Sequence, residues 1–273
     1  MAVITISRQV AALGDEIATA AAKKMGYRFV DRKQIEARIV ELGFPAEKMQ
    51  KYDERKPGFF ASLAKDRDEY LNYLQYAVLE AAKGGNCILI GRGSFIILDD
   101  VPNLISLRFV SNDSIRLERL KAEFSWNDKQ AQTRIDESDN NRRGFHKSFF
   151  NLANEDPQHF HMVLNTGMLS IDDSVKVIEG LVKSLITAEK ETAGKKRIAA
   201  LLKGQELVNQ LLFSFHLNIN FLRAVVQEDE ITLQGVADSQ ALADRAVQAA
   251  AKILPTCRIK SAISIVQDFK TYQ

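Results

Sequence analysis

The chain has 273 residues, a formal net charge of +2 and a charged fraction of 26%, which is ordinary for a globular protein in water. This charge balance argues against a surface built for nucleic acid, and no run of about 18 apolar residues predicts a membrane span. The N-terminus has no basic segment followed by an apolar run, so we expect no signal peptide and a cytoplasmic location. Histidines and cysteines lack metal-ligand spacing, so we predict no metal site in the chain itself.

The first pattern in the chain predicts a strand, a turn and a helix. Residues 3–6 are β-branched and mostly apolar, as in a buried strand, and helical periodicity begins at Asp15. In α/β proteins such a turn lies at the carboxyl edge of the sheet, where ligands bind. A glycine-rich turn there holds phosphate with its amides and the helix N-terminus. Here Gly14 is the one glycine and no lysine is present, so the pattern G-x-x-x-x-G-K-[ST] is absent.

Further strands and helices alternate along the chain. Apolar segments predict strands at residues 28–30, 87–90, 104–110 and 162–164, and helical patterns cover residues 33–42, 58–83, 112–124 and 170–188. Residues 45–57 and 127–149 are polar and charged, and the apolar run resumes at residues 95–98. Alternating strands and helices predict an α/β domain, residues 1–188, with a parallel sheet covered by helices on both faces.

The composition changes near residue 190. Residues 189–196 are charged and contain a glycine, which predicts a linker. Residues 197–273 then show a helix, two strands, a helix from residue 239 to 253 and a final strand. This order predicts a second, smaller α+β domain.

Four short segments in order resemble the cytidylate kinase-like proteins, a branch of the P-loop nucleoside monophosphate kinases. They are Ile4-Thr5-Ile6-Ser7-Arg8, Phe29-Val30-Asp31-Arg32, Ile88-Leu89-Ile90-Gly91-Arg92-Gly93 and Asn165-Thr166-Gly167-Met168-Leu169-Ser170-Ile171. The resemblance covers residues 3–185. It implies a P-loop kinase fold and phosphoryl transfer from ATP, with Mg²⁺, to a nucleoside monophosphate, CMP before others.

The resemblance also implies a role for particular residues. In this interpretation one group holds the donor nucleotide, a second holds the acceptor, and a third closes over the transferring phosphoryl group. The three groups are Ser7, Arg8 and Gly14; Asp31, Arg32 and Arg92; and Arg119, Asp139 and Arg142.

Each of these residues also has a structural interpretation. Arg8 could pair with Glu16 or Asp31 at the strand end, and Arg92 could form a structural salt bridge. Asp31 could cap the helix that follows it. The arginines near residues 116–143 could line a solvated helix face instead of a lid.

The turn departs from the family pattern S-R-x-x-G-S-G-G-x-x-I-A, because Ala11, Ala12 and Leu13 stand where glycine, serine and glycine are usual. A phosphate cradle needs backbone angles that are open mainly to glycine. We therefore predict weak ATP binding and slow turnover. The alternatives are a nucleotide-binding or regulatory module with impaired catalysis, and an assembly scaffold without a ligand.

Residues 197–267 resemble a BON domain. The segment Ile231-Thr232-Leu233-Gln234-Gly235 carries the resemblance, together with the alanine-rich helix that follows it. It implies an interaction module, through which a protein partner or a second copy of the chain could bind and through which a nucleotide-binding domain could signal.

Overall fold

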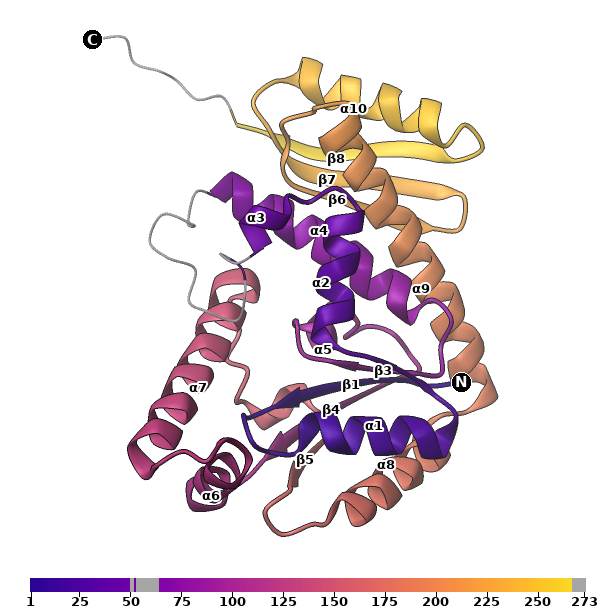
Figure 1. Ribbon diagram of the computed structural model, residues 1–273. Coiled ribbons are helices and arrows are strands. Elements are labelled where there is room, and N and C mark those ends of the chain that lie inside the picture. The colour runs from indigo at the N-terminus through magenta and orange to yellow at the C-terminus, as the bar shows by residue number, and fades with distance from the viewer. Residues whose placement is uncertain (50–51, 53–63, 267–273) are drawn as a thin grey trace, which may run out of the picture. The chain divides into compact units, whose positions relative to one another are not determined.

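The computed structural model describes residues 1–49, 52 and 64–266 (Figure 1). The chain divides into two compact units, Met1–Lys195 and Lys196–Gln273. Within the described residues, no helix is both long and apolar enough to cross a membrane.

The first unit contains a parallel sheet in the order β2-β3-β1-β4-β5. Its strands are β1 (Val3–Arg8), β2 (Arg28–Val30), β3 (Cys87–Ile90), β4 (Leu104–Val110) and β5 (Met162–Asn165). They coincide with the predicted apolar segments, and all neighbouring pairs run parallel. The predicted fold class is therefore confirmed. In the register, Ser7 of β1 lies beside Arg108 of β4, which becomes important at the site.

Helices cover both faces of this sheet (Figure 1). On one face, α1 (Gly14–Met25) and α8 (Ile171–Leu185) pack against a core that contains Ile4, Ile6 and Leu107. On the other face lie α2 (Arg32–Glu41), α4 (Ala64–Ala82) and the short α5 (Ser94–Ile97). Successive residues of a strand point to opposite faces of the sheet. Ile4 and Ile6 of β1 therefore both point to the face that α1 and α8 cover.

Two further helices lie at the edge toward which the strands point, α6 (Asp113–Phe124) and α7 (Asp128–Phe150) (Figure 1). The polar segment 127–149 is thus helical, and a capping box between Asn127 and Gln130 starts it. Its buried residues Ala131, Ile135 and Ser138 recur at helical spacing among charged ones, as on an amphipathic helix.

Some predicted boundaries differ from the structure. The apolar run at residues 95–98, for which no element was predicted, forms most of α5 and its C-cap. In the polar and charged segment 45–57, residues 46–49 form a short helix, α3 (Ala46–Met49). The helix predicted from residue 58 is described from Ala64 onward, and residues 58–63 lie outside the described part. A short 3₁₀ turn, η2 (Pro157–His159), precedes β5.

The predicted linker, residues 189–196, lies inside the helix α9 (Ala188–Asn209), which continues into a π-helical turn, η3 (Gln210–Ser214). Gly194 packs closely against Asn103. A Cβ atom at position 194 would come within 1.8 Å of the Asn103 Oδ1 atom, so this contact requires glycine. Glycine here serves a close contact and does not end the helix.

The second unit has the predicted order of elements. Strands β6 (Asn220–Gln227), β7 (Glu230–Ala237) and β8 (Arg258–Ile265) form a sheet in that order, antiparallel between β6 and β7 and parallel between β7 and β8. Helix α10 (Gln240–Ile253) buries its alanines Ala243, Ala246, Ala249 and Ala250.

Candidate functional site

The turn between β1 and α1 adopts a backbone that usually requires glycine. Ala11 has φ of 57° and Leu13 has φ of 54°, both in the left-handed region. For a residue with a Cβ atom this conformation costs about 1–2 kcal/mol. Leu13 stands at the N-cap of α1 and makes no side-chain capping bond. The turn therefore retains glycine-like geometry without the glycines.

Arg8 lies over the start of α1. A Cβ atom on Gly14 would come within 2.7 Å of the Arg8 Cγ atom, so any larger residue at position 14 would displace the Arg8 side chain. The Arg8 Nε atom lies 3.8 Å from the Asp15 Oδ2 atom. Arg8 thus brings a cation to the positive end of a helix, beside the carboxylate of Asp15 in the first turn.

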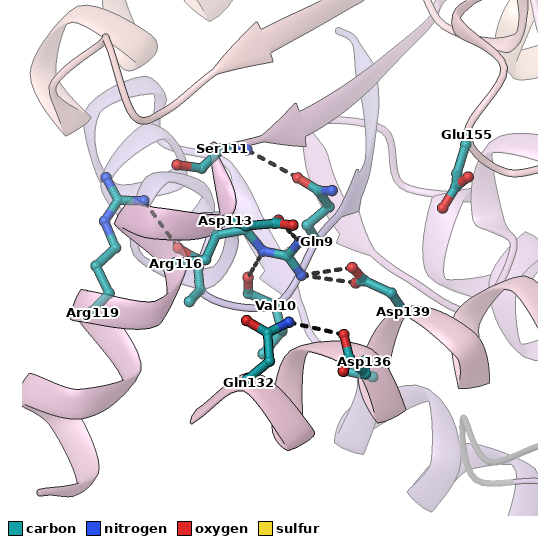
Figure 2. A network of polar contacts seen from close by, with 12 residues as sticks. Gln9, Val10, Ser111, Asp113, Arg116, Arg119, Gln132, Asp136, Asp139 and Glu155 are labelled. Atoms are coloured by element: carbon teal, nitrogen blue, oxygen red, sulfur yellow. Dashed lines mark hydrogen bonds and ion pairs between the residues drawn. The ribbon is translucent and has the colours of Figure 1, made fainter. Parts of the chain in front are cut away.

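Two arginines of α6 hold the carbonyl groups of the turn (Figure 2). The Arg116 Nε atom donates to the Val10 carbonyl at 3.0 Å, and the Arg119 Nη1 atom donates to the Ala11 carbonyl at 2.9 Å. Arg119 also donates to the carbonyl of Thr166 at 2.7 Å, and burial lowers the pKa of Arg119. These bonds from Nη1 and Nη2 of Arg119 tie the carbonyl groups of Ala11 and Thr166 to α6.

Asp139 holds Arg116 in place. Both carboxylate oxygens of Asp139 accept from the Arg116 Nη2 atom, at 2.9 and 2.8 Å, and Asp113 accepts from Nη1 at 2.9 Å (Figure 2). Arg116 is only 1% exposed, so these carboxylates compensate a buried charge. Nearby, the Gln9 Oε1 atom accepts a hydrogen bond from the backbone N–H of Ser111 at 2.9 Å.

Arg92 is buried at the end of β3 with a left-handed backbone, φ of 53°. Its guanidinium donates to the Tyr52 carbonyl at 2.7 Å and pairs with the Glu36 carboxylate. Burial, and then the nearby charges of Arg32 and Arg8, lower the pKa of Arg92 to about 9. The group is thus still a cation at neutral pH.

Arg8, Arg92 and Arg142 line one small enclosed space together with Ser7 and Phe145. Its volume is about 10 Å³, which is at most enough for a single water molecule. Aromatic side chains of α7 close it, and Phe150 packs so tightly on Gly93 that a Cβ atom there would lie 2.4 Å from the Phe150 ring. Arg142 donates to the Ser138 hydroxyl at 2.6 Å.

The acceptor residues on the second strand lie differently. Asp31 is the N-cap of α2, where its Oδ1 atom accepts from the Gln34 N–H at 2.8 Å. The Arg32 Nε atom lies 3.5 Å from the Glu36 carboxylate, which Arg92 shares. Neither Arg32 nor Asp31 lines the enclosed space, and the Glu36 carboxylate connects Arg32 to Arg92.

Arg108 is a residue of the site that the sequence reasoning missed. It is buried in β4, donates to the Ser7 hydroxyl at 3.0 Å and lies over the Phe160 ring at 5.9 Å. Burial lowers the pKa of Arg108. The available signal was its position, because an arginine within the apolar segment Leu-Ile-Ser-Leu-Arg-Phe-Val is unusual for a core strand.

A larger cavity, about 380 Å³, lies away from the turn. Its lining includes Phe95, Ser106, His159 and His161. The His161 Nδ1 atom accepts from the Ser106 N–H at 3.0 Å, and burial lowers the pKa of His161. The described residues contain no group of three or more His, Cys, Asp or Glu side chains that could hold a metal ion.

A parallel sheet of this order, with a turn from β1 into α1 at its carboxyl edge, defines a P-loop kinase-like fold. Residues 3–168 match the cytidylate kinase-like family, and the chain belongs to that family. The match ends before the second unit.

Solved structures of similar fold cover about two thirds of the chain. An uncharacterized protein from Eubacterium ventriosum is 16% identical, with a TM-score of 0.52 over 67% of this chain and 99% of its own. The shikimate kinase of Bacteroides thetaiotaomicron is 14% identical, with a TM-score of 0.42 over 67% and 98%. A gluconokinase of Sinorhizobium meliloti is 15% identical, with a TM-score of 0.40 over 67% and 95%. No curated protein sequence matches the chain.

Proposed function

We propose that the first unit binds ATP at the turn after β1 and transfers its terminal phosphoryl group to a nucleoside monophosphate, with CMP the first acceptor to test. The family supports nucleotide chemistry. The observation that carries the proposal is the position of Arg8 over Gly14, which places a cation where the turn lacks a lysine.

In this proposal Ser7, Arg8 and Gly14 contact the donor phosphates, Arg92 binds the acceptor phosphate, and Arg142 neutralises charge on the transferring group. Asp31 and Arg32, at the start of α2, would lie beside the bound acceptor. Arg119 and Asp139, which the sequence assigned to catalysis, act here by fixing the turn and Arg116. A bound Mg²⁺ ion would neutralise phosphate charge, and its ligands would be mostly phosphate oxygens and water.

We expect this transfer to be slow. Ala11 and Leu13 occupy left-handed conformations, and a Cβ atom limits how closely a phosphate approaches the backbone. The acidic residues Asp15 and Glu16 in the first turn of α1 oppose an added anion. Turnover should therefore lie far below the range of about 1–100 s⁻¹ that is usual for kinases.

A coupled ADP-release assay with CMP and Mg²⁺, beside a calorimetric titration with each nucleotide, tests the proposal. Arg92→Ala should weaken CMP binding by about 1.5–3 kcal/mol, as expected for hydrogen bonds to a charged group. Failure of both ATP and CMP to bind would refute the nucleotide function. Turnover in the usual range would show that the altered turn is tolerated.

A second candidate is a nucleotide-responsive module without turnover, whose BON-like second unit transmits the response to a protein partner or a second copy. Closure of the acceptor space favours it, because Glu36 and Tyr52 already bind Arg92 and Phe150 covers Gly93. Nucleotide binding without ADP release, together with a nucleotide-dependent change of molecular mass in sedimentation of the full chain, would support this candidate over the enzyme.

A further inference from the structure

Arg108 is a buried cation without a carboxylate partner. It is 4% exposed, and within residues 1–49, 52 and 64–266 no carboxylate lies within ion-pair distance of its guanidinium. Its contacts there are one hydrogen bond, to the Ser7 hydroxyl, and the Phe160 ring. A buried charge without a counter-charge is strongly unfavourable, so its retention calls for a compensating group.

The nearby acids are already engaged elsewhere. Asp139 and Glu155 act on Arg108 electrostatically from a longer distance. Asp139 binds Arg116 through both oxygens, and Glu155 lies 3.2 Å from the Arg143 Nη1 atom. Arg116 itself repels Arg108. These acids therefore reduce the local positive charge without contacting Arg108.

The Ser7 hydroxyl connects Arg108 to the enclosed space, where hydrogen-bond donors and positive charges are likewise in excess. Its hydroxyl accepts the hydrogen bond from Arg108, and in the described part of the chain its own proton has no acceptor. Ser7 is 5% exposed and lines the space that Arg8, Arg92 and Arg142 also line. The Ser7 hydroxyl therefore borders a space whose lining contains the cationic side chains of Arg8, Arg92 and Arg142.

We propose that Arg108 and Ser7 form the floor of an oxyanion site that takes a phosphoryl group. The acceptor-only oxygens of a tetrahedral oxyanion complement these donors, because the Ser7 hydroxyl would donate to the anion and the anion would supply the counter-charge that Arg108 lacks. The inference rests on the proposed function in that the phosphoryl group would belong to the bound nucleotide. Arg108 then provides from the sheet part of what the altered turn lacks.

Binding requires the site to open. The enclosed volume of about 10 Å³ is too small for a phosphate ion, so the side chains of α7 that close it, Arg142 and Phe145, move outward when the anion enters. Both belong to one helix at the edge of the sheet, and neither contributes to the β1–β4 register that holds Ser7 beside Arg108.

The test is thermal unfolding of the full chain in inorganic phosphate, against sodium chloride of equal ionic strength. Phosphate should raise the Tm of the wild-type protein, because a ligand that binds the folded state stabilises it. Arg108→Met should abolish this rise and, since it removes an uncompensated buried charge, should leave the Tm in phosphate-free buffer equal or higher. The matched control Arg134→Met, an exposed arginine on α7, should respond as the wild type does.

Calorimetric titration gives the second readout. Arg108→Met should weaken phosphate binding roughly 10- to 160-fold, the equivalent of a hydrogen bond to a charged group. If that variant does not fold, Ser7→Ala retains the charge, loses the donor, and should also bind phosphate more weakly. A wild-type Tm that is insensitive to phosphate, or variants that bind phosphate as the wild type does, would overturn the inference.

The failure of the inference and of the proposed function are distinguishable. Phosphate binding that depends on Arg108 in a protein that releases no ADP would support the oxyanion site and refute the kinase. ADP release that continues unchanged in Arg108→Met would support the kinase and refute the site.

Discussion

Replacing Asp139 by asparagine tests whether this carboxylate holds the site together. The substitution keeps the shape and one acceptor oxygen but removes the charge that compensates Arg116, whose side chain is 1% exposed. Breaking a buried ion pair costs about 3–5 kcal/mol. Asp139 is 18% exposed and Asp113 remains on Arg116, so we expect a smaller loss of about 2–3 kcal/mol in the free energy of unfolding.

Urea unfolding of the full chain, followed by circular dichroism, measures this loss. Asp136→Asn is the matched control, because Asp136 lies on the same helix, is exposed and bonds only Gln132 in the described part of the chain. It should change stability by less than about 0.5 kcal/mol. A loss below about 1 kcal/mol for Asp139→Asn, or equal losses for both variants, would refute the argument that Asp139 acts through Arg116.

Three further predictions follow from the turn and from the cavity beside β4. Gly14→Ala should displace the Arg8 side chain and weaken ATP binding in calorimetry by about 1.5–3 kcal/mol, and unchanged affinity would exclude Arg8 from the donor site. Ala11→Gly with Leu13→Gly should strengthen ATP binding because the two Cβ atoms no longer limit how closely a phosphate approaches the backbone of the turn; no gain would mean that the turn is not the defect. Burial lowers the pKa of His161, so the unfolded chain binds that proton first as the pH falls below about 6.5, and stability should decrease there. In His161→Asn this part of the pH dependence should disappear, and an unchanged profile would contradict it.

Much of the fold was predictable because it depends on short-range patterns. Apolar β-branched runs mark β1, β3 and β4 with bounds close to those observed, since a strand buried on both faces needs no polar alternation. The boundary elements were less predictable. Residues 189–196 have the composition of a linker yet form part of α9, where Gly194 allows a close contact with Asn103, which is distant in sequence.

The sequence by itself determined which residue types reach the carboxyl edge of the sheet at three of its strands, because Ser7 and Arg8 end β1, Asp31 follows β2 and Arg92 follows β3. Only the tertiary structure decided their partners. Arg92 is closed in by aromatic side chains of α7, and Arg116 meets Asp139 across 23 positions of sequence. Arg108 acquires its significance from the register that sets it beside Ser7. The electrostatic energy of a charged side chain depends mainly on the groups within a few ångströms of it. Packing between elements that are distant in sequence decides which groups these are, so local sequence patterns do not predict them.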